Sequence, residues 1–226
     1  MDDALPSLPK VPIFPLPHGA LLPGELLPLH IFEPRYRRML EVVRAGDRLM
    51  AIATLLGPCG AGDPPVAGVV GVGRVVKDRK NKDGTSDIVL HGLARGEILA
   101  EVADDRDAEP FRRAHVVVGP AGTTHATQMF RTRRELLHGL AERLPGGGLQ
   151  YDVTAGFDAG ALVDRIASAL ALPPDERVTV MQALDVDARR RHLMRLLDDP
   201  THRQRLAEII PSLGAFGLAP APETHT

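Results

Sequence analysis

Short apolar runs separated by turn residues fill the first half of the chain, a pattern typical of strands rather than of long helices. The runs cover residues 27–32, 48–56 and 111–119. Two more runs, GVVGVGRVVKD and DIVLHGLARGEILAEV, flank Asp83-Gly84, a dipeptide that favours the tight turn of a β-hairpin. The pattern therefore predicts a closed or half-closed barrel over residues 11–119.

A helical period interrupts this half once, over residues 34–45. Apolar residues recur there at spacings of three, four and seven, which places them on one face of a helix. These residues are Tyr36, Met39, Leu40 and Val43. Pro34 suits the first turn of the helix, and Gly46 predicts its end.

After Gly122 the period becomes helical throughout. Helices are predicted over residues 124–144, 157–172, 175–184, 185–199 and 201–210. Asp158 and Asp185 are candidate N-caps, and Pro174 can open the third of these helices. The inward positions are predicted to be Met129, Leu136, Leu137, Leu140, Leu144, Leu162, Val163, Ile166, Ala169, Leu170, Val186, Leu193 and Leu197.

The change of period predicts an α+β chain, β-rich before a boundary near residues 119–123 and helical after it. We expect an N-terminal extension over 1–10, a β-barrel domain over 11–120 and a helical bundle over 121–210. The last segment, 211–226, ends in GLAPAPETHT and is expected to be a flexible tail.

The stretch PIFPLPHGALLPGELLPLHIFEPRYRRML, residues 12–40, joins six prolines to a dense set of large apolar side chains. Proline disfavours helices and central strands, so the stretch has the composition of a loop. A loop this apolar would expose its side chains to water unless it packed inside the protein. Leu21 and Leu22 could line the core or form an apolar lip, and the core interpretation is favoured.

Composition argues against some partners. The 226 residues are 44% hydrophobic and 25% charged, with a net charge of −2, which gives no electrostatic attraction for nucleic acid or anionic lipid. No apolar run reaches the roughly 18 residues that span a bilayer. The acidic N-terminus lacks the basic region and apolar core of a signal peptide, so we expect a cytoplasmic protein without a membrane partner.

Catalytic and metal-binding templates do not fit this sequence. Cys59 is the only cysteine, which excludes an intrachain disulfide and a cysteine cluster for zinc, and we interpret it as an incidental loop thiol. No serine lies in G-x-S-x-G, and no phosphate loop occurs. The nine histidines are dispersed. A hydrolase would therefore need a pocket that joins histidine and carboxylate from both halves, and we predict no catalytic, cofactor or metal residues.

Five pieces of the chain, taken in order over residues 9–199, resemble the N-terminal substrate-binding domain of Lon proteases. The opening stretch matches at Pro12, Pro15-Leu16, Pro23-Gly24 and Pro28-Leu29. GVVGVGRVV resembles the family's glycine-bearing strand, and DGTSDIVLHGLARGEI resembles its next motif through Gly92 and Arg95. The helical half matches at Asp164, Ile166, Ala167, Leu170, Gln182, Leu184, Asp185 and Arg189.

The resemblance implies a PUA-like β pseudo-barrel followed by a small helical bundle, in a bacterial protein related to ATP-dependent proteases. It also implies a non-catalytic module, without a cofactor, that recognises unfolded or apolar polypeptide segments or a protein partner. No phosphate loop or Ser-Lys dyad can be assigned, so we expect no enzyme activity. The alternative is an RNA-binding PUA-like protein, against which the net charge argues. The residues that line a peptide groove, and the oligomeric state, stay open.

Overall fold

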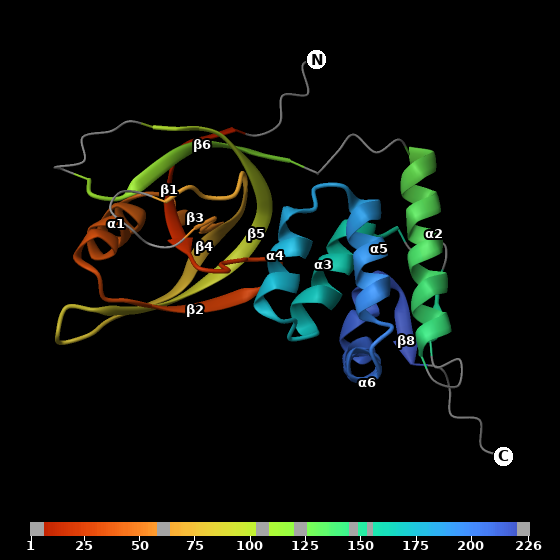
Figure 1. Cartoon of the computed structure of the whole chain (residues 1–226). Coiled ribbons are helices and arrows are strands. Elements are labelled where there is room, and N and C mark those ends of the chain that lie inside the picture. Colours follow the sequence, from red (N-terminus) through yellow and green to blue (C-terminus); the bar gives the residue numbers. More distant parts are fainter. Residues whose placement is uncertain are drawn as a thin grey trace. The chain divides into compact units, whose positions relative to one another are not determined.

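The computed structural model describes residues 7–57, 64–102, 109–119, 126–144, 149–152 and 156–220. The chain divides into two compact units (Figure 1). The barrel unit comprises residues 1–120 and 173–182, and the helical unit comprises residues 121–172 and 183–226.

The barrel unit is built on a six-stranded mixed sheet. Its strands are β1 (Ser7–Leu16), β2 (Leu26–Ile31), β3 (Leu49–Thr54), β4 (Val69–Lys80), β5 (Ser86–Glu101) and β6 (Arg112–Val118). The strand order is β2-β5-β4-β3-β1-β6, and only the β1–β3 pair is parallel among the described pairings. The long β5 also pairs with β6, so the sheet curls back on itself, as Figure 1 shows. The predicted α+β class with a half-closed barrel is confirmed.

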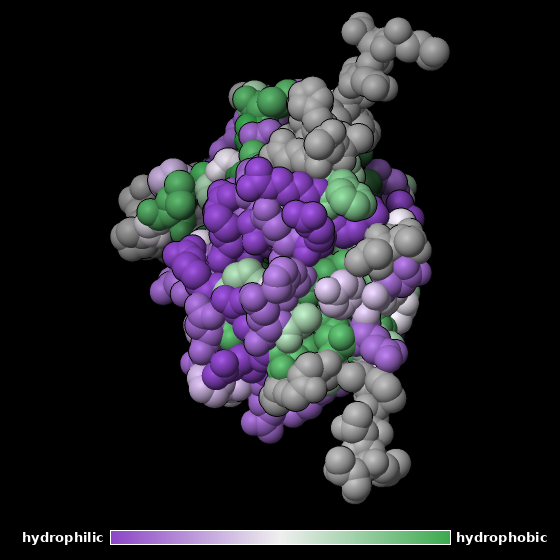
Figure 2. All heavy atoms as spheres, turned by 90° about the vertical axis from the view of Figure 1, so that its right-hand side faces the viewer, coloured by the Kyte–Doolittle hydropathy of each residue, from purple (hydrophilic) through white to green (hydrophobic). Residues whose placement is uncertain are grey.

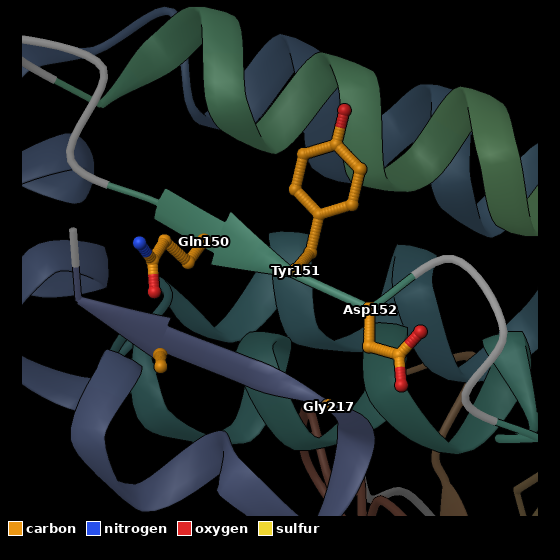
Figure 3. A pocket seen from close by; sticks show the side chains of 5 residues that line it. Gln150, Tyr151, Asp152 and Gly217 are labelled. Carbon is orange, nitrogen blue, oxygen red and sulfur yellow. The ribbon is translucent and has the colours of Figure 1, made fainter.

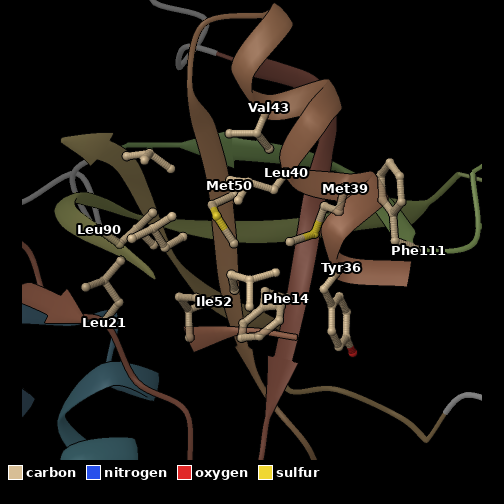
Figure 4. Packing of buried hydrophobic residues seen from close by; sticks show 13 residues of the cluster. Phe14, Leu21, Tyr36, Met39, Leu40, Val43, Met50, Ile52, Leu90 and Phe111 are labelled. Carbon is tan, nitrogen blue, oxygen red and sulfur yellow. The ribbon is translucent and has the colours of Figure 1, made fainter. Parts of the chain in front are cut away.

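Helix α1 (Pro34–Ala45) covers the interior of the barrel unit with the predicted face. Its four apolar residues are all buried and join the core cluster shown in Figure 4. The ring of Tyr36 meets that of Phe14 edge-on, with centroids 4.4 Å apart. The helix ends where the Gly46 N–H binds the Val42 carbonyl. Among the described residues before 119, α1 is the only helix, as the period predicted.

The predicted hairpin forms between β4 and β5, whose last and first residues, Lys80 and Ser86, are paired. Gly84 lies in the turn with a φ of +83°. One carboxylate oxygen of Asp83 accepts hydrogen bonds from the Thr85 N–H at 3.0 Å and the Thr85 hydroxyl at 2.7 Å. Asp83-Gly84 therefore fixes the turn as the sequence indicated.

The apolar loop between β1 and β2 lies inside the barrel unit. Leu21 and Leu22 are both fully buried, which confirms the core interpretation. The loop backbone passes so close to the sheet that a Cβ added at Gly71 would lie 2.2 Å from the Leu21 carbonyl oxygen. A Cβ added at Gly92 would lie 2.2 Å from the Leu22 oxygen. The glycines of β4 and β5 thus make room for the loop.

The short helix α4 (Pro174–Gln182) belongs to the barrel unit, which differs from its predicted place in a domain over 121–210. Arg95, only 5% exposed, donates hydrogen bonds to the carbonyls of Val180 and Met181 at 3.1 and 3.2 Å. Gln182 donates to the Val69 carbonyl at 2.9 Å. The apolar period predicted the helix but contains no information about which unit supplies its partners.

The helical unit contains α2 (Ala126–Arg143), α3 (Ala159–Ala169), α5 (Val186–Leu196) and α6 (Pro200–Ile209), with a two-stranded sheet of β7 (Leu149–Tyr151) and β8 (Leu218–Pro220). Asp158 and Asp185 cap α3 and α5 as predicted, accepting from the N–H groups of Ala161 and Ala188. Arg189 of α5 lies 3.4 Å from Asp164 of α3, with both side chains buried. This ion pair joins the two helices.

Three positions differ from the expectations. Met129, predicted to point inward, is 41% exposed. Residues within the expected tail form a 3-10 helix (Ile210–Phe216) and β8, because Leu213 and Leu218 are buried and β8 pairs with β7. Strand β1 begins inside the expected extension, where Ser7 pairs with Val117 of β6. Residues 1–6 and 221–226 lie outside the described residues.

Candidate functional site

Three neighbouring strands of the barrel unit present one outward surface, which we call the β2 face. It consists of three cross-strand rows that run from β2 through β5 to β4. The rows are Leu26–His91–Arg74, Pro28–Val89–Lys77 and His30–Asp87–Arg79. The alternate residues of these strands point into the core, where Ile31, Val75, Ile88 and Leu90 are buried.

The β2 face is more apolar than an outward sheet surface usually is. Strands with one solvated face normally alternate apolar and polar residues. Here the outward positions of β2 include Leu26, which is 60% exposed, and Pro28. Phe32, just beyond the strand, is 61% exposed, and its ring stacks on that of His30 with centroids 6.1 Å apart. Exposed apolar side chains that lie side by side, as Leu26, Pro28 and Phe32 do along β2 and just beyond it, are typical of a surface that binds another chain.

An open depression of about 550 Å³ lies in the β2 face. Its lining residues are Pro28, Leu29, His30, Lys77, Asp78, Arg79, Asp87, Ile88 and Val89. Apolar side chains of β2 and β5 thus adjoin a basic margin on β4. The depression spans three neighbouring strands and suits a segment of polypeptide.

The carboxylates of this region are already hydrogen-bonded. Asp87 accepts from Arg79 at 2.7 Å and Asn81 at 3.1 Å, and its other oxygen lies 2.7 Å from the His30 Nδ1. These three groups, Arg79 first, hold the pKa of Asp87 well below its usual range. Asp78 accepts two hydrogen bonds from Arg44, which lower its pKa in the same way.

The lowered pKa of Asp87 predicts a pH dependence. Because the pKa is lower in the folded protein than in the unfolded chain, its contribution to stability is complete above the unfolded value of about 3.9. That contribution is lost as the pH falls through the folded pKa. We expect the Asp87 carboxyl to titrate below other exposed aspartates in an NMR titration, and Arg79→Gln to raise its pKa. An unchanged pKa in that variant would contradict the assignment to Arg79.

Strand β2 is an edge strand, because β5 is its only partner among the described strands. The Gly92 N–H binds the Glu25 carbonyl, so odd-numbered residues of β2 face β5 and even-numbered residues direct their backbone to the free edge. Pro28 stands in the middle of that edge and has no N–H to offer. The proline interrupts the edge, which limits the addition of another strand.

Two further depressions lie in the helical unit. One, of about 500 Å³, is lined by Gln150, Tyr151, Asp152, Gly217 and Ala219, and Figure 3 shows Tyr151 pointing from β7 toward α2. It brings together an amide, a phenol and a carboxylate, without a histidine, cysteine or serine. The side of the molecule shown in Figure 2, which includes α2, carries mainly hydrophilic side chains over its middle. These features favour the β2 face as the candidate site.

The other depression, of about 540 Å³, lies along α5 and contains Arg190, Arg191 and Arg195. The guanidinium of Arg190 binds Glu135 at 2.9 Å and Asp187 at 2.8 Å. Arg191 pairs with the same Asp187. Carboxylates therefore already neutralise much of the positive charge of this depression.

Among the described residues, one histidine–carboxylate pair joins the first half of the sequence to the second. The Nδ1 of His18 lies 2.8 Å from Asp175, but these side chains are 61% and 86% exposed, so no enclosed pocket surrounds them. The same part of the chain contains no group of three potential metal ligands, and none of its helices has the length and apolarity needed to cross a membrane. Cys59, His125 and His225 lie outside the described residues.

The fold and the site define an α+β protein whose main candidate site is an apolar surface on a curled sheet. A family model described as the ATP-dependent protease La (LON) substrate-binding domain matches residues 10–199. The chain belongs to this family.

Relatives of known sequence are several times longer than this chain. Lon protease 4 of Sorangium cellulosum (strain So ce56) is 28% identical over 192 residues, which are 82% of this chain and 23% of that protein. Lon protease 2 of Myxococcus xanthus is 24% identical over 218 residues, which are 91% of this chain and 26% of that protein. The chain thus spans about a quarter of the length of these relatives.

Solved structures share the fold. The N-terminal domain of the Mycobacterium avium complex Lon protease matches with a TM-score of 0.60 and 19% identity, covering 84% of this chain and 99% of that one. The Lon N-terminal domain protein from Xanthomonas campestris matches with a TM-score of 0.54 and 22% identity, covering 84% and 98%. The likeness confirms the fold that the sequence motifs indicated.

Proposed function

We propose that this chain is a non-catalytic module that binds extended, apolar polypeptide segments on the β2 face. The observation that carries the proposal is the exposure of Leu26 on the edge strand β2 and of Phe32 just beyond it, both about 60%, beside an open depression. Membership of a family described as a substrate-binding domain supports it. The relatives of known sequence are named as proteases.

Binding on the β2 face is an equilibrium without a covalent step. Side chains of the segment would cover Leu26, Pro28 and Phe32, which releases water from apolar surface and contributes ~25 cal/mol per Å². Backbone pairing adds little, because Pro28 interrupts the free edge of β2. Ordering a flexible segment opposes these gains, so we expect modest affinity.

The arrangement of charge favours polypeptide over RNA. RNA binding needs basic side chains on one continuous face. On α1 two exposed arginines pair with carboxylates: Arg35 binds Glu33, the N-cap residue, at 2.9 Å, and Arg38 binds Glu41 at 2.8 Å. RNA binding is the alternative, and the experiment below distinguishes it from polypeptide binding.

The test measures binding of a fluorescent unfolded reporter protein to the full chain and to the double variant Leu26→Ser/Phe32→Ser. We expect the double variant to bind about tenfold more weakly, because each substitution removes an apolar contact of about 0.7 kcal/mol, and 1.4 kcal/mol is a factor of ten. The reporter should be recovered uncleaved. A matched control is Leu99→Ser, since Leu99 is 67% exposed on β5 but lies outside the β2 face.

Salt separates the two alternatives. Reporter binding driven by apolar contact should change little between ~50 and ~200 mM salt, whereas binding to phosphates falls steeply over this range. A short single-stranded RNA that binds at low salt and dissociates at high salt, with no reporter binding, would refute the proposal. Equal losses in the double variant and in Leu99→Ser would refute the β2 face as the site.

A further inference from the structure

We propose that the segment bound on the β2 face carries carboxylates beside its apolar residues, so that the module selects acidic over basic apolar segments. This inference rests on the proposed function and specifies the class of segment. It is carried by two cations of the β2 face, Arg74 and Lys77, and by their position relative to the apolar side chains of Leu26 and Pro28.

Arg74 and Lys77 are both exposed on β4, and neither forms a hydrogen bond or ion pair with another described residue. Lys77 lines the depression together with Pro28 and Val89. A cation beside apolar surface attracts a carboxylate and repels an ammonium group of a bound chain. The charge of the β2 face therefore discriminates between segments that its apolar surface alone would bind equally.

A β-bulge aims both cations outward. Residues three apart on a regular strand point to opposite faces. The pairing of β4 with β5 shifts register between Val75 and Lys77, so Val76 is an extra residue in β4. As a result Arg74 and Lys77 occupy neighbouring rows of the same face, opposite His91 and Val89 of β5.

The spacing of these rows matches an extended chain. Adjacent outward rows are two residues apart along β2, which corresponds to about 7 Å. Side chains at positions i and i+2 of an extended segment point the same way and are separated by the same distance. A segment lying over β5 can therefore direct two carboxylates at i and i+2 toward Arg74 and Lys77 on β4 and its alternate, apolar side chains toward Leu26 and Pro28 on β2.

The acidic residues of the region do not cancel this charge. Asp87, the one carboxylate in the three rows, is bonded by Arg79, which offsets its charge, and it also meets His30 and Asn81. Asp78 also lines the depression, but its pairing residue in β5 is the buried Ile88, and both its oxygens are bonded by Arg44. Arg74 and Lys77 thus keep their charge available for a bound segment.

The experiment uses three fluorescent peptides with one apolar core that differ at positions i and i+2, where they carry two glutamates, two glutamines or two lysines. Affinities are measured by anisotropy with the full chain at ~50 mM salt, where exposed charges are weakly screened. We expect the glutamate peptide to bind about threefold to tenfold more tightly than the glutamine peptide, as two exposed ion pairs allow. The lysine peptide should bind most weakly.

The double variant Arg74→Gln/Lys77→Gln should abolish this preference, so that the glutamate and lysine peptides bind with the same affinity. Lys80→Gln/Lys82→Gln removes the same total charge near the hairpin turn and should retain the preference. Equal binding of the glutamate and lysine peptides, with the glutamine peptide still bound, would overturn this inference alone. Loss of the preference in both double variants would also overturn it. If none of the peptides binds, the proposed function fails, and this inference fails with it.

Discussion

Replacing Gly92 with alanine should lower the free energy of unfolding by about 3 kcal/mol, at the upper end of what overpacking a core costs. The added Cβ would lie 2.2 Å from the Leu22 carbonyl oxygen, 3.1 Å from its carbonyl carbon and 3.2 Å from the Leu21 Cγ. The first two of these atoms are backbone, so no side chain can rotate to relieve the clash. The loop that holds Leu21 and Leu22 in the core must move instead.

Chemical denaturation followed by circular dichroism measures this change. The control is Gly68→Ala, because Gly68 is exposed in the barrel unit and an added Cβ there would meet nothing within 4 Å. We expect Gly68→Ala to change stability by less than about 0.5 kcal/mol, as is usual for surface substitutions. A Gly92→Ala protein as stable as the Gly68→Ala protein would show that the loop can shift without cost.

The sequence predicted the elements of the barrel unit well because its signals there are local. Asp83-Gly84 fixes its own turn, and Tyr36, Met39, Leu40 and Val43 identify the buried face of α1 without knowledge of any partner. The place of α4 was different, because its partners Arg95 and Val69 lie about 85 and 113 residues earlier in the chain. Periodicity reports that a helix has a partner surface but not which surface it is.

The β2 face could not be predicted from the sequence. Apart from His30, residues 26–32 are apolar on both faces of the strand, with Leu27, Leu29 and Ile31 directed inward and Leu26, Pro28 and Phe32 outward. Neither alternation nor composition separates the two sets. The parity becomes visible only through the register with β5, which places Leu27 opposite the buried Leu90.

The motif residues that carried the family resemblance have structural roles in this fold. Gly92 makes room for the apolar loop, and Arg95 binds the end of α4. Asp164 and Arg189 form the buried pair between α3 and α5, and Arg189 also donates to the carbonyls of Ala183 and Leu184 at 2.9 and 2.7 Å. The motifs therefore identified the fold, whereas the candidate binding surface lies on other side chains.

Arg95→Met should lower the free energy of unfolding of the barrel unit by about 3 kcal/mol, because it removes hydrogen bonds from a charged donor to two acceptors. Methionine keeps most of the apolar length of the side chain, so the loss reports the guanidinium rather than a cavity. The carbonyls of Val180 and Met181 belong to the last turn of α4 and have no further helical N–H to bind. The positive charge of Arg95 also complements the negative end of the helix dipole.

Amide hydrogen exchange locates the effect. We expect exchange to become faster in α4 first, because Arg95 binds α4 directly, while the amides of β1 and β3 at the centre of the sheet order retain their protection. Arg74→Met is the matched control, since Arg74 is an exposed arginine on the adjacent strand and should change stability by less than about 0.5 kcal/mol. Unchanged protection of α4 in Arg95→Met would show that Gln182 and Arg177, which bind Val69 and Glu25, hold the helix without Arg95.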